Sequence, residues 1–445
     1  MNGKKYDILL LGSTGYTGQM ILEYLLKKYE KEITNGQIKL LCAVRNINRL
    51  NEILLRLKEK EKLRNTEKIY KKEVDVVNNY DSILSCCKMC DVVVSTIGPY
   101  AIYGYNIVKA CVQANCHYLD ACGEHDFILR IYKEFNEIAK EKKLKIIHSA
   151  SFISALSDLG TYIIQEEFLS KYKKPCSYVR IRLSNEGSDF RTVGKTTIKS
   201  ALLFKKRLGN SYNKHYLCEN KYDDISSTDD GFPLYEKKIK TTNYFFDYEE
   251  EFGYCFDTVY SKIEEAYVLW SNYLMNYKYG KNLVIDYKQY DAELSMPMYI
   301  IKRMFSMLIN GLKYLTPVDY VTDKYVDYLH KPKTSDQLKK GFWKCTIVGE
   351  MCDMYTDGTQ NKNSDDNTNS NENENKGNKK IILHLNGENE DPGYLLTAKI
   401  ISESAISLFQ NNLPNSFGVL SVSVGLGMAL VERLKQASLC IHVEV

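Results

Sequence analysis

The stretch "LLLGSTGYTGQM", residues 9–20, sets three glycines, Gly12, Gly15 and Gly18, at even spacing directly after a short apolar run. A glycine at the end of a strand permits a sharp turn, and two further glycines let the backbone approach a phosphate and let the next helix pack closely. The start of that helix adds unpaired N–H groups and a positive dipole end. The pattern therefore favours a dinucleotide pyrophosphate site over the alternative, a plain turn between a strand and a helix, which rarely needs all three glycines.

The residues expected to hold the pyrophosphate are the glycines and the residues between them, namely Gly12, Ser13, Thr14, Gly15, Tyr16, Thr17 and Gly18. A second group should line the cofactor, because "STIGPYAIYG" follows the fourth predicted strand at its carboxyl end, where an open α/β sheet places its ligands. This group comprises Ser95, Thr96, Gly98 and Pro99.

The end of the second predicted strand, in "CAVRNINRL" (42–50), bears on the choice between the two nicotinamide dinucleotides. An acidic residue there would bind the ribose 2′-hydroxyl of NAD, whereas Arg45, followed by Asn46, matches a 2′-phosphate. The alternative is that Arg45 and Arg49 belong to a solvated helix start. We predict NADP as the cofactor in preference to NAD.

Strand-like and helix-like segments alternate along the first 150 residues. Short apolar runs are predicted as strands at 5–11, 38–44, 68–76, 90–98, 116–123 and 144–150. The intervening segments carry an apolar stripe opposite charged residues, as covering helices do. Such alternation requires crossover connections, so the predicted class is α/β, with an N-terminal Rossmann domain built on a doubly wound parallel sheet and a second mixed α/β domain.

The composition sets the broad limits. A chain of 445 residues is long for one core, which predicts two domains. Its 60 basic and 56 acidic residues give a net charge of +4 without a basic half, so we expect a small-molecule substrate and no nucleic acid. The 13 cysteines lack the dense spacing of a disulfide framework and no signal peptide is recognisable, so we expect a reducing, cytoplasmic location.

The domains are expected at 1–160 and 161–400, with a C-terminal segment, 401–445, that returns to the Rossmann domain. "FWKCTIVGEM" (342–351) and "KKIILHLNGE" (379–388) read as an antiparallel hairpin whose Asn-rich connection, about 355–380, is expected to be a disordered insertion. The apolar segment 295–317 contains charges that disfavour a transmembrane helix. It is either an interfacial helix on a membrane or lipid-droplet surface, or a helix packed on its own domain or at the seam of a homodimer.

Six blocks of the sequence together resemble the saccharopine-dehydrogenase-like oxidoreductases, a group that includes the bacterial trans-acting enoyl reductases. The blocks are "LLGSTGYTGQ", "STIGPYAIYGYNIVKAC", "YLDACGEHDF", "SALSDLG", "DPGYLLTAKIISESA" and "GVLSVSVGLGMALVERL". The similarity runs from about residue 5 to the C-terminus, with a weak middle from about 205 to 340. The resemblance implies an NAD(P)-binding Rossmann domain, an inserted second domain, and reductase activity on a lipid-like or amino-acid-derived substrate.

One departure from the family pattern concerns a carboxylate. Where relatives usually read Gly-Phe-Asp-Ser with a following proline, this chain has Ser151, Phe152, Ile153, Ser154, Ala155 and Leu156. Ile153 thus replaces an acid, and if that acid touches substrate or nicotinamide in the relatives, the chemistry here is altered or absent. The second strand's usual Gly-Arg pair is Val44-Arg45, which keeps the charge but crowds the adenosine side.

The sequence offers two sets of catalytic candidates. Glu124 and His125, in "DACGEHDF", follow the fifth predicted strand at the ligand edge, and a histidine there could titrate near neutral pH. The alternative is that Glu124 and Asp126 cap the next helix. Tyr105 and Lys109 form a YxxxK spacing that can lower a tyrosine pKa and create a proton donor, although 35 tyrosines make chance matches expected.

Two further features favour a structural interpretation. His148 ends the sixth predicted strand near the same edge, where a lone histidine is more often a hydrogen-bonded packing residue than a catalytic one. "CCKMC" contains a CxxC pair, Cys87 and Cys90, but no partner pair follows at zinc-ribbon spacing, and Cys111 and Cys116 fall in separate elements. We predict buried thiols and no bound metal.

These observations predict an NADP-dependent oxidoreductase that transfers a hydride to a lipid-like carbonyl or enoyl group, or to an imine. The alternative, which the replacement at Ile153 favours, is a catalytically inactive NADPH-binding scaffold or sensor at a lipid surface.

Overall fold

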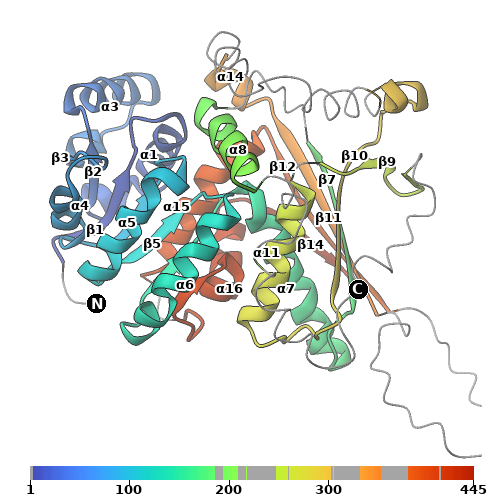
Figure 1. The fold of residues 1–445 in the computed structure, drawn as a ribbon. Coiled ribbons are helices and arrows are strands. Elements are labelled where there is room, and N and C mark those ends of the chain that lie inside the picture. Colours follow the sequence, from blue (N-terminus) through green and yellow to red (C-terminus); the bar gives the residue numbers. More distant parts are fainter. Residues whose placement is uncertain are drawn as a thin grey trace, which may run out of the picture.

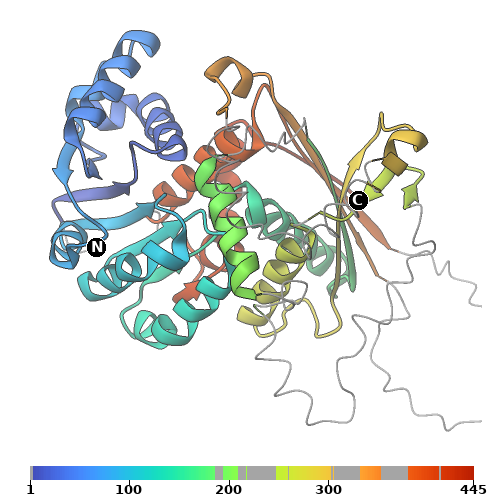
Figure 2. The ribbon, with the colours of Figure 1, turned by 45° about the horizontal axis from the view of Figure 1, so that its top comes forward.

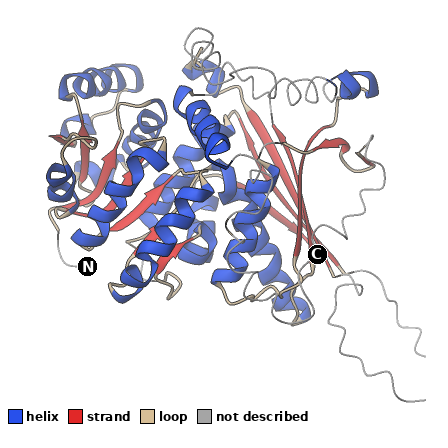
Figure 3. Cartoon of the chain, in the orientation of Figure 1, coloured by secondary structure: helices blue, strands red, loops and turns tan. Residues whose placement is uncertain are grey.

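The computed structural model describes residues 4–185, 194–208, 217, 247–258, 260–301, 304, 331–351, 379–409 and 412–445. Two seven-stranded sheets stand apart, and helices lie between them and on the outer face of the first sheet (Figure 1, Figure 3). The predicted α/β class is confirmed.

The first sheet is parallel, with the strand order β13-β6-β5-β4-β1-β2-β3. Its strands are β1 (Tyr6–Leu11), β2 (Leu40–Val44), β3 (Tyr70–Glu73), β4 (Cys90–Ser95), β5 (His117–Asp120), β6 (Lys145–Ile147) and β13 (Gly418–Leu420). Strand β1, which lies between β4 and β2 inside the sheet, is almost wholly apolar because both of its faces are covered. The doubly wound parallel sheet is therefore present as predicted, and the C-terminal part of the chain adds its last strand beside β6.

Helices cover both faces of the first sheet. Leu9 and Leu11 pack with the helices α4 (Tyr80–Cys87), α5 (Tyr100–Ala114) and α6 (His125–Glu141). Ile8 and Leu10 belong to a second core with α1 (Tyr16–Lys28), α3 (Ile47–Glu61), α15 (Thr397–Ser407) and α16 (Val422–Gln436). This second core continues through α7 (Phe152–Tyr172) to the other sheet, so the two sheets share one apolar interior.

The second sheet is mixed, with the order β14-β12-β11-β7-β10-β9-β8. Its strands are β7 (Tyr178–Asn185), β8 (Tyr248–Glu249), β9 (Gly253–Phe256), β10 (Val284–Asp291), β11 (Phe342–Glu350), β12 (Lys380–Glu388) and β14 (Cys440–Glu444). The helices α7 and α11 (Ser261–Leu274) cover the face that is turned to the first sheet (Figure 2). The predicted antiparallel hairpin is confirmed, because β11 pairs with β12 from Phe342 opposite Glu388 to Glu350 opposite Lys380.

The remaining described helices are α2 (Glu30–Thr34), α8 (Lys195–Leu208), α14 (Ser335–Leu338), a 3₁₀ turn η1 (Asn65–Lys68) and a π-helical turn η5 (Pro392–Leu396). The Asn-rich insertion falls outside the described residues except for its last two positions, 379 and 380. Of the segment 295–317, the structure describes 295–301 and 304. Among the described helices, none combines the length and the apolar character that crossing a membrane requires.

Candidate functional site

The glycine turn has the geometry that a bound pyrophosphate requires. Gly12 has a φ of +87°, and a Cβ on Gly18 would lie 2.1 Å from the Gly12 carbonyl oxygen, so neither position accepts a side chain. Gly15 is exposed and precedes α1, and no side chain caps this helix start. The N–H groups of the first turn of α1 are therefore free of a capping side chain, and the glycines beside them leave room for a ligand. This arrangement fits the diphosphate of a dinucleotide.

The other predicted residues of this turn differ in what their side chains do. Ser13 is buried, and the Thr14 carbonyl accepts a hydrogen bond from Gln19 at 3.0 Å. The Tyr16 hydroxyl donates to the Lys333 carbonyl at 2.6 Å, and its ring packs edge-on against Tyr394. Tyr16 thus joins the turn to the second domain, and only its main chain remains available to a phosphate.

Arg45 and Asn46 follow β2 directly and are both exposed. The Asn46 side chain accepts a hydrogen bond from the Arg49 N–H at 3.0 Å and so caps α3. This commits Asn46 to the helix start, while the exposed Arg45 guanidinium stands at the strand end where a ribose 2′-phosphate would lie.

The residues after β4 sit against the glycine turn. The Thr96 hydroxyl donates to the Leu11 carbonyl at 3.1 Å, and a Cβ on Gly12 would meet its Oγ1 at 2.5 Å. Ser95 is buried and Pro99 precedes α5. A Cβ on Gly98 would lie 3.1 Å from Thr196 of α8, so this loop borders the second domain. The structure brings the 12–18 and 95–99 groups together at one edge of the first sheet.

Glu124 lies at that edge, but its carboxylate is fully engaged. It accepts hydrogen bonds from the N–H groups of Tyr100 at 2.7 Å and Ala101 at 3.3 Å, and from the Ser200 hydroxyl. Arg207 of α8 forms an ion pair with it at 2.7 Å. Glu124 precedes α6 without capping it, and instead caps α5. Glu124 therefore does cap a helix, but the helix is α5 and not α6, the next helix in the sequence.

The other candidates point away from a shared site. His125 is buried with its ring near Phe204 and Tyr267. Tyr105 packs against Arg130 and Phe135 of α6, and Lys109 lies over the Tyr80 ring. A hydrogen bond to Glu134 raises the pKa of Tyr105, which is opposite to the lowering that the YxxxK interpretation requires. The contacts of Tyr105 thus give the YxxxK interpretation no support, and a catalytic role of Tyr105 and Lys109 stays a prediction.

His148 is a packing residue with a defined partner. Its Nδ1 lies 2.8 Å from Asp120 Oδ2, and both side chains are fully buried. Asp120 also accepts hydrogen bonds from the Cys122 and Ser149 N–H groups. This network fixes the loops after β5 and β6, which form the floor of the site.

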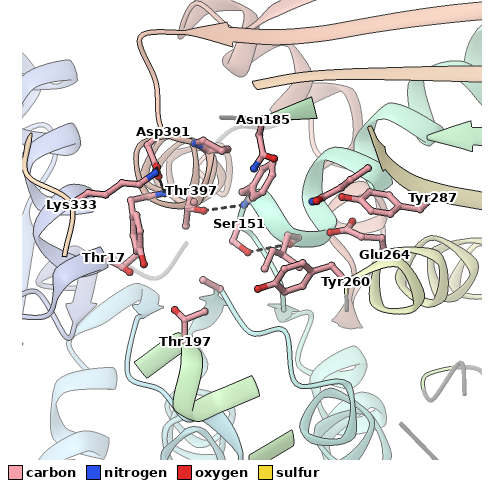
Figure 4. Close-up of a pocket in the computed structure, with 17 residues that line it drawn as sticks. Thr17, Ser151, Asn185, Thr197, Tyr260, Glu264, Tyr287, Lys333, Asp391 and Thr397 are labelled. Atoms are coloured by element: carbon pink, nitrogen blue, oxygen red, sulfur yellow. Dashed lines mark hydrogen bonds and ion pairs between the residues drawn. The ribbon is translucent and has the colours of Figure 1, made fainter. Parts of the chain in front are cut away.

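A pocket opens between the nucleotide edge of the first sheet and the second sheet (Figure 4). Figure 4 shows Thr17 of α1 on one side, and Glu264 and Tyr287 on the other. The residues that line it are Thr17, Ala121, Ser151, Phe152, Ile153, Asn185, Thr197, Tyr260, Glu264, Tyr287, Gln289, Lys333, Asp391, Pro392, Gly393, Tyr394 and Thr397. Lys333 is the basic side chain among the described lining residues, and its charge is already neutralised by an ion pair with Asp391 at 2.6 Å.

Glu264 is the functional candidate that sequence reasoning missed. It lies in α11, and its Oε1 accepts a hydrogen bond from the Ser154 N–H at 2.9 Å. Burial raises its pKa to about 7, although hydrogen bonds from the Ser157 hydroxyl and the Ser154 N–H favour the carboxylate. The sequence "SKIEEAYVLW" around it (261–270) reads as an ordinary helix, so no local signal could have indicated this role.

Three cysteines gather away from the pocket. Cys87, Cys111 and Cys116 are buried, with all three sulfur atoms within 4.8 Å of one another. The Cys116 thiol donates a hydrogen bond to the Cys111 carbonyl at 3.5 Å, a contact that buried cysteines commonly make. Sequence spacing did not foresee this cluster, and the absence of a metal stays a prediction.

The fold and the glycine turn define a Rossmann-type dinucleotide-binding protein. Residues 8–147 match the model of the saccharopine dehydrogenase NADP binding domain. The first domain is therefore similar to the NADP-binding domain of that family, and the resemblance that the motifs predict, with NADP as the cofactor, is confirmed.

Individual relatives agree with this assignment. The chain is 26% identical over 203 residues to the rat saccharopine dehydrogenase-like oxidoreductase, covering 45% of this chain and 46% of the relative. It is 25% identical over 188 residues to the lipid droplet localized protein of Caenorhabditis elegans, covering 42% of each chain. It is 28% identical over 161 residues to a candidate trans-acting enoyl reductase of Mycobacterium tuberculosis, covering 36% of each chain. Each match spans less than half the length of the relative.

The likeness in fold extends over the whole chain. Saccharopine dehydrogenase (L-Glu forming) from Saccharomyces cerevisiae, in its apo form, superimposes with a TM-score of 0.54 over 99% of both chains at 10% identity. This likeness concerns the fold, so the second domain is arranged as in that enzyme without implying its reaction.

Proposed function

We propose that the protein is an NADPH-dependent reductase whose substrate occupies the pocket between the two sheets. The observation that carries the proposal is the position of Thr17, which belongs to the first turn of α1 and also lines the pocket. If α1 holds a dinucleotide, the residues at the carboxyl ends of β4 and β5 would hold its nicotinamide half, and Ala121, which follows β5, forms part of the pocket wall. The bound nicotinamide supplies a hydride, and the pocket supplies placement.

The residues proposed to hold NADP are those of the two groups at the nucleotide edge. The main chain of 12–18 would bind the diphosphate, Arg45 the 2′-phosphate, and Ser95, Thr96, Gly98 and Pro99 the nicotinamide half. Asn46 supports this arrangement indirectly, because it caps the helix behind Arg45.

The lining favours a substrate that carries an apolar body and no carboxylate near the reacting group. Phe152, Ile153 and Pro392 contribute apolar surface, and Lys333 is paired with Asp391. A free carboxylate would remain without a cationic partner among the described lining residues. A lipid-like carbonyl or enoyl group fits these walls better than an amino-acid-derived imine, which agrees with the names of the worm and mycobacterial relatives.

The test is NADPH oxidation, followed by absorbance, with a panel of an acyl aldehyde, a 2-enoyl thioester and an amino-acid imine. We expect turnover with the aldehyde or the thioester and a lower rate with NADH. Tight NADPH binding without turnover on any of the three would contradict the proposal and leave the scaffold as the better account.

The scaffold alternative has one structural observation in its favour. Met296, Met298, Ile301 and Met304 are exposed at the start of the segment 295–317. Exposed apolar side chains of this kind suit contact with lipid or with a second copy of the chain. Vesicle flotation of Ile301→Lys with Met304→Lys, compared with the parent chain, separates lipid binding from dimer formation. A homodimer stays a prediction.

A further inference from the structure

The 151–156 loop at the pocket has no carboxylate of its own, and a carboxyl group beside it comes from another element. Residues 151–156 read Ser-Phe-Ile-Ser-Ala-Leu, and Ile153 lines the pocket with an apolar side chain. Glu264 of α11 lines the same pocket, and its Oε1 accepts a hydrogen bond from the N–H of Ser154, the next residue of the loop. Helix α11 thus places an acid at the pocket, directly beside this loop (Figure 4).

The loop is held in a strained conformation that serves this contact. Ser154 has a φ of +77°, a left-handed value that is costly for a residue with a side chain. In this conformation its N–H points at the Glu264 carboxyl group. A strained residue whose N–H holds an acid at a pocket wall is the arrangement expected at a site that positions a reacting group.

The surroundings of Glu264 raise its pKa, so that its protonated and ionised forms are both present at neutral pH. Among the residues that the structure describes, the ionisable groups that act on it are Asp158 of α7, Tyr260 before α11, Tyr287 of β10 and Cys345 of β11. None of these four groups is a cation, and burial together with Asp158 disfavours the Glu264 carboxylate. A pKa of about 7 is suited to an acid that gives and regains a proton at neutral pH.

We propose that Glu264 is the proton donor of the reduction, an inference that rests on the proposed reductase function. When a hydride adds to the carbon of a polarised C=O bond, or to the β-carbon of an enoyl group, the π electron pair moves to the oxygen or to the α-carbon. That atom forms a bond to the Glu264 proton as the O–H bond of the carboxyl group breaks. The two electrons come from NADPH, which leaves as NADP⁺, and the Glu264 carboxylate regains a proton from water.

The kinetic test compares Glu264→Gln with Glu265→Gln, a buried neighbour on the same helix that pairs with Lys262. We expect Glu264→Gln to lower kcat at least 100-fold while its Kd for NADPH stays within about threefold of the parent. Glu265→Gln should keep most of the parent kcat. In the parent, the rate should fall as the pH rises above about 7, and Glu264→Gln should lack this fall.

A second readout is independent of turnover. The Tm difference between Glu264→Gln and the parent should grow as the pH rises from about 4.5 to 8, because only the parent must ionise a buried group. A constant Tm difference, or a Glu264→Gln variant with more than a third of the parent kcat, overturns the proton-donor role and leaves the reductase function intact. A parent chain that binds NADPH but reduces none of the three substrates overturns both.

Discussion

The site has two sides, the nucleotide edge of the first sheet and the pocket wall formed by α11, and each holds one buried glutamate of a different kind. On the nucleotide side, Glu124 accepts hydrogen bonds from the N-terminus of α5 and pairs with Arg207. On the opposite side, Glu264 faces Asp158 and tyrosine hydroxyls, and its pKa is raised to about 7. Position at a ligand edge therefore does not identify a reactive acid. The charges that surround the carboxyl group decide whether it stabilises the fold or remains available for proton transfer.

The largest expected effect is an opposite change in stability for the two glutamates. Glu264 has a folded-state pKa of about 7 against 4.5 for an unperturbed glutamate, so the folded state holds this proton more tightly than the unfolded chain does. Stability from this group is complete below about pH 4.5 and is lost as the pH rises to about 7. At pH 8 we expect Glu264→Gln to raise the free energy of unfolding by about 3 kcal/mol.

Glu124→Gln should act in the other direction. The substitution removes a negative charge that pairs with Arg207 and that also strengthens the cap of α5. We therefore expect the free energy of unfolding to fall by about 2–3 kcal/mol at pH 8. Chemical denaturation of both variants beside the parent measures the two changes. If both variants lose stability at pH 8, the proposed difference between Glu124 and Glu264 is wrong.

The next largest effect is expected at the glycine turn, and it tests whether the nucleotide edge of the first sheet binds NADPH. Gly15 is exposed and a Cβ there would lie 3.1 Å from the Gly12 carbonyl oxygen, so Gly15→Trp places an indole over the turn without entering the core. We expect the Kd for NADPH to rise at least about 100-fold, equivalent to about 2.7 kcal/mol. Gly15→Ala should have a much smaller effect. Fluorescence titration with NADPH measures both, and unchanged binding in Gly15→Trp would remove the site from this turn.

These contrasts show which parts of the site local sequence could indicate. The glycine turn and Arg45 follow single strands directly, so the alternation of apolar runs and turns was enough to place them. Glu124 was found, but its partner Arg207 lies far along the chain, which explains why its capping of α5 was not foreseen. Glu264 reaches the pocket only because α11 packs beside α7, and that contact depends on tertiary packing rather than on any pattern near residue 264.

A smaller effect concerns the choice of cofactor. Arg45 is exposed at the end of β2, and a 2′-phosphate distinguishes NADPH from NADH at this position. We expect Arg45→Asp to weaken NADPH binding about 10- to 100-fold, as loss of a charge-assisted contact does, and to change NADH binding about threefold at most. Arg49→Asp, which makes the same change of charge in the first turn of α3, is the matched control. Equal effects of the two variants would indicate general electrostatic attraction instead of a specific phosphate contact.

The smallest effect concerns the hydrogen bond between Tyr16 and Lys333, which joins the glycine turn to the pocket wall. The Tyr16 hydroxyl donates to the Lys333 carbonyl at 2.6 Å, and burial raises its pKa, so it remains a protonated donor at every physiological pH. Tyr16→Phe keeps the ring packing on Tyr394 and removes one hydrogen bond, which should cost about 1 kcal/mol of stability. Binding of NADPH should stay unchanged, since the turn offers its main chain to the diphosphate. Tyr248→Phe, at an exposed position, is the control for thermal unfolding and NADPH titration. If the NADPH Kd of Tyr16→Phe rises more than about fivefold, the contact between Tyr16 and Lys333 is itself part of the nucleotide site. Nucleotide binding would then depend on both sides of the site and not on the nucleotide edge alone.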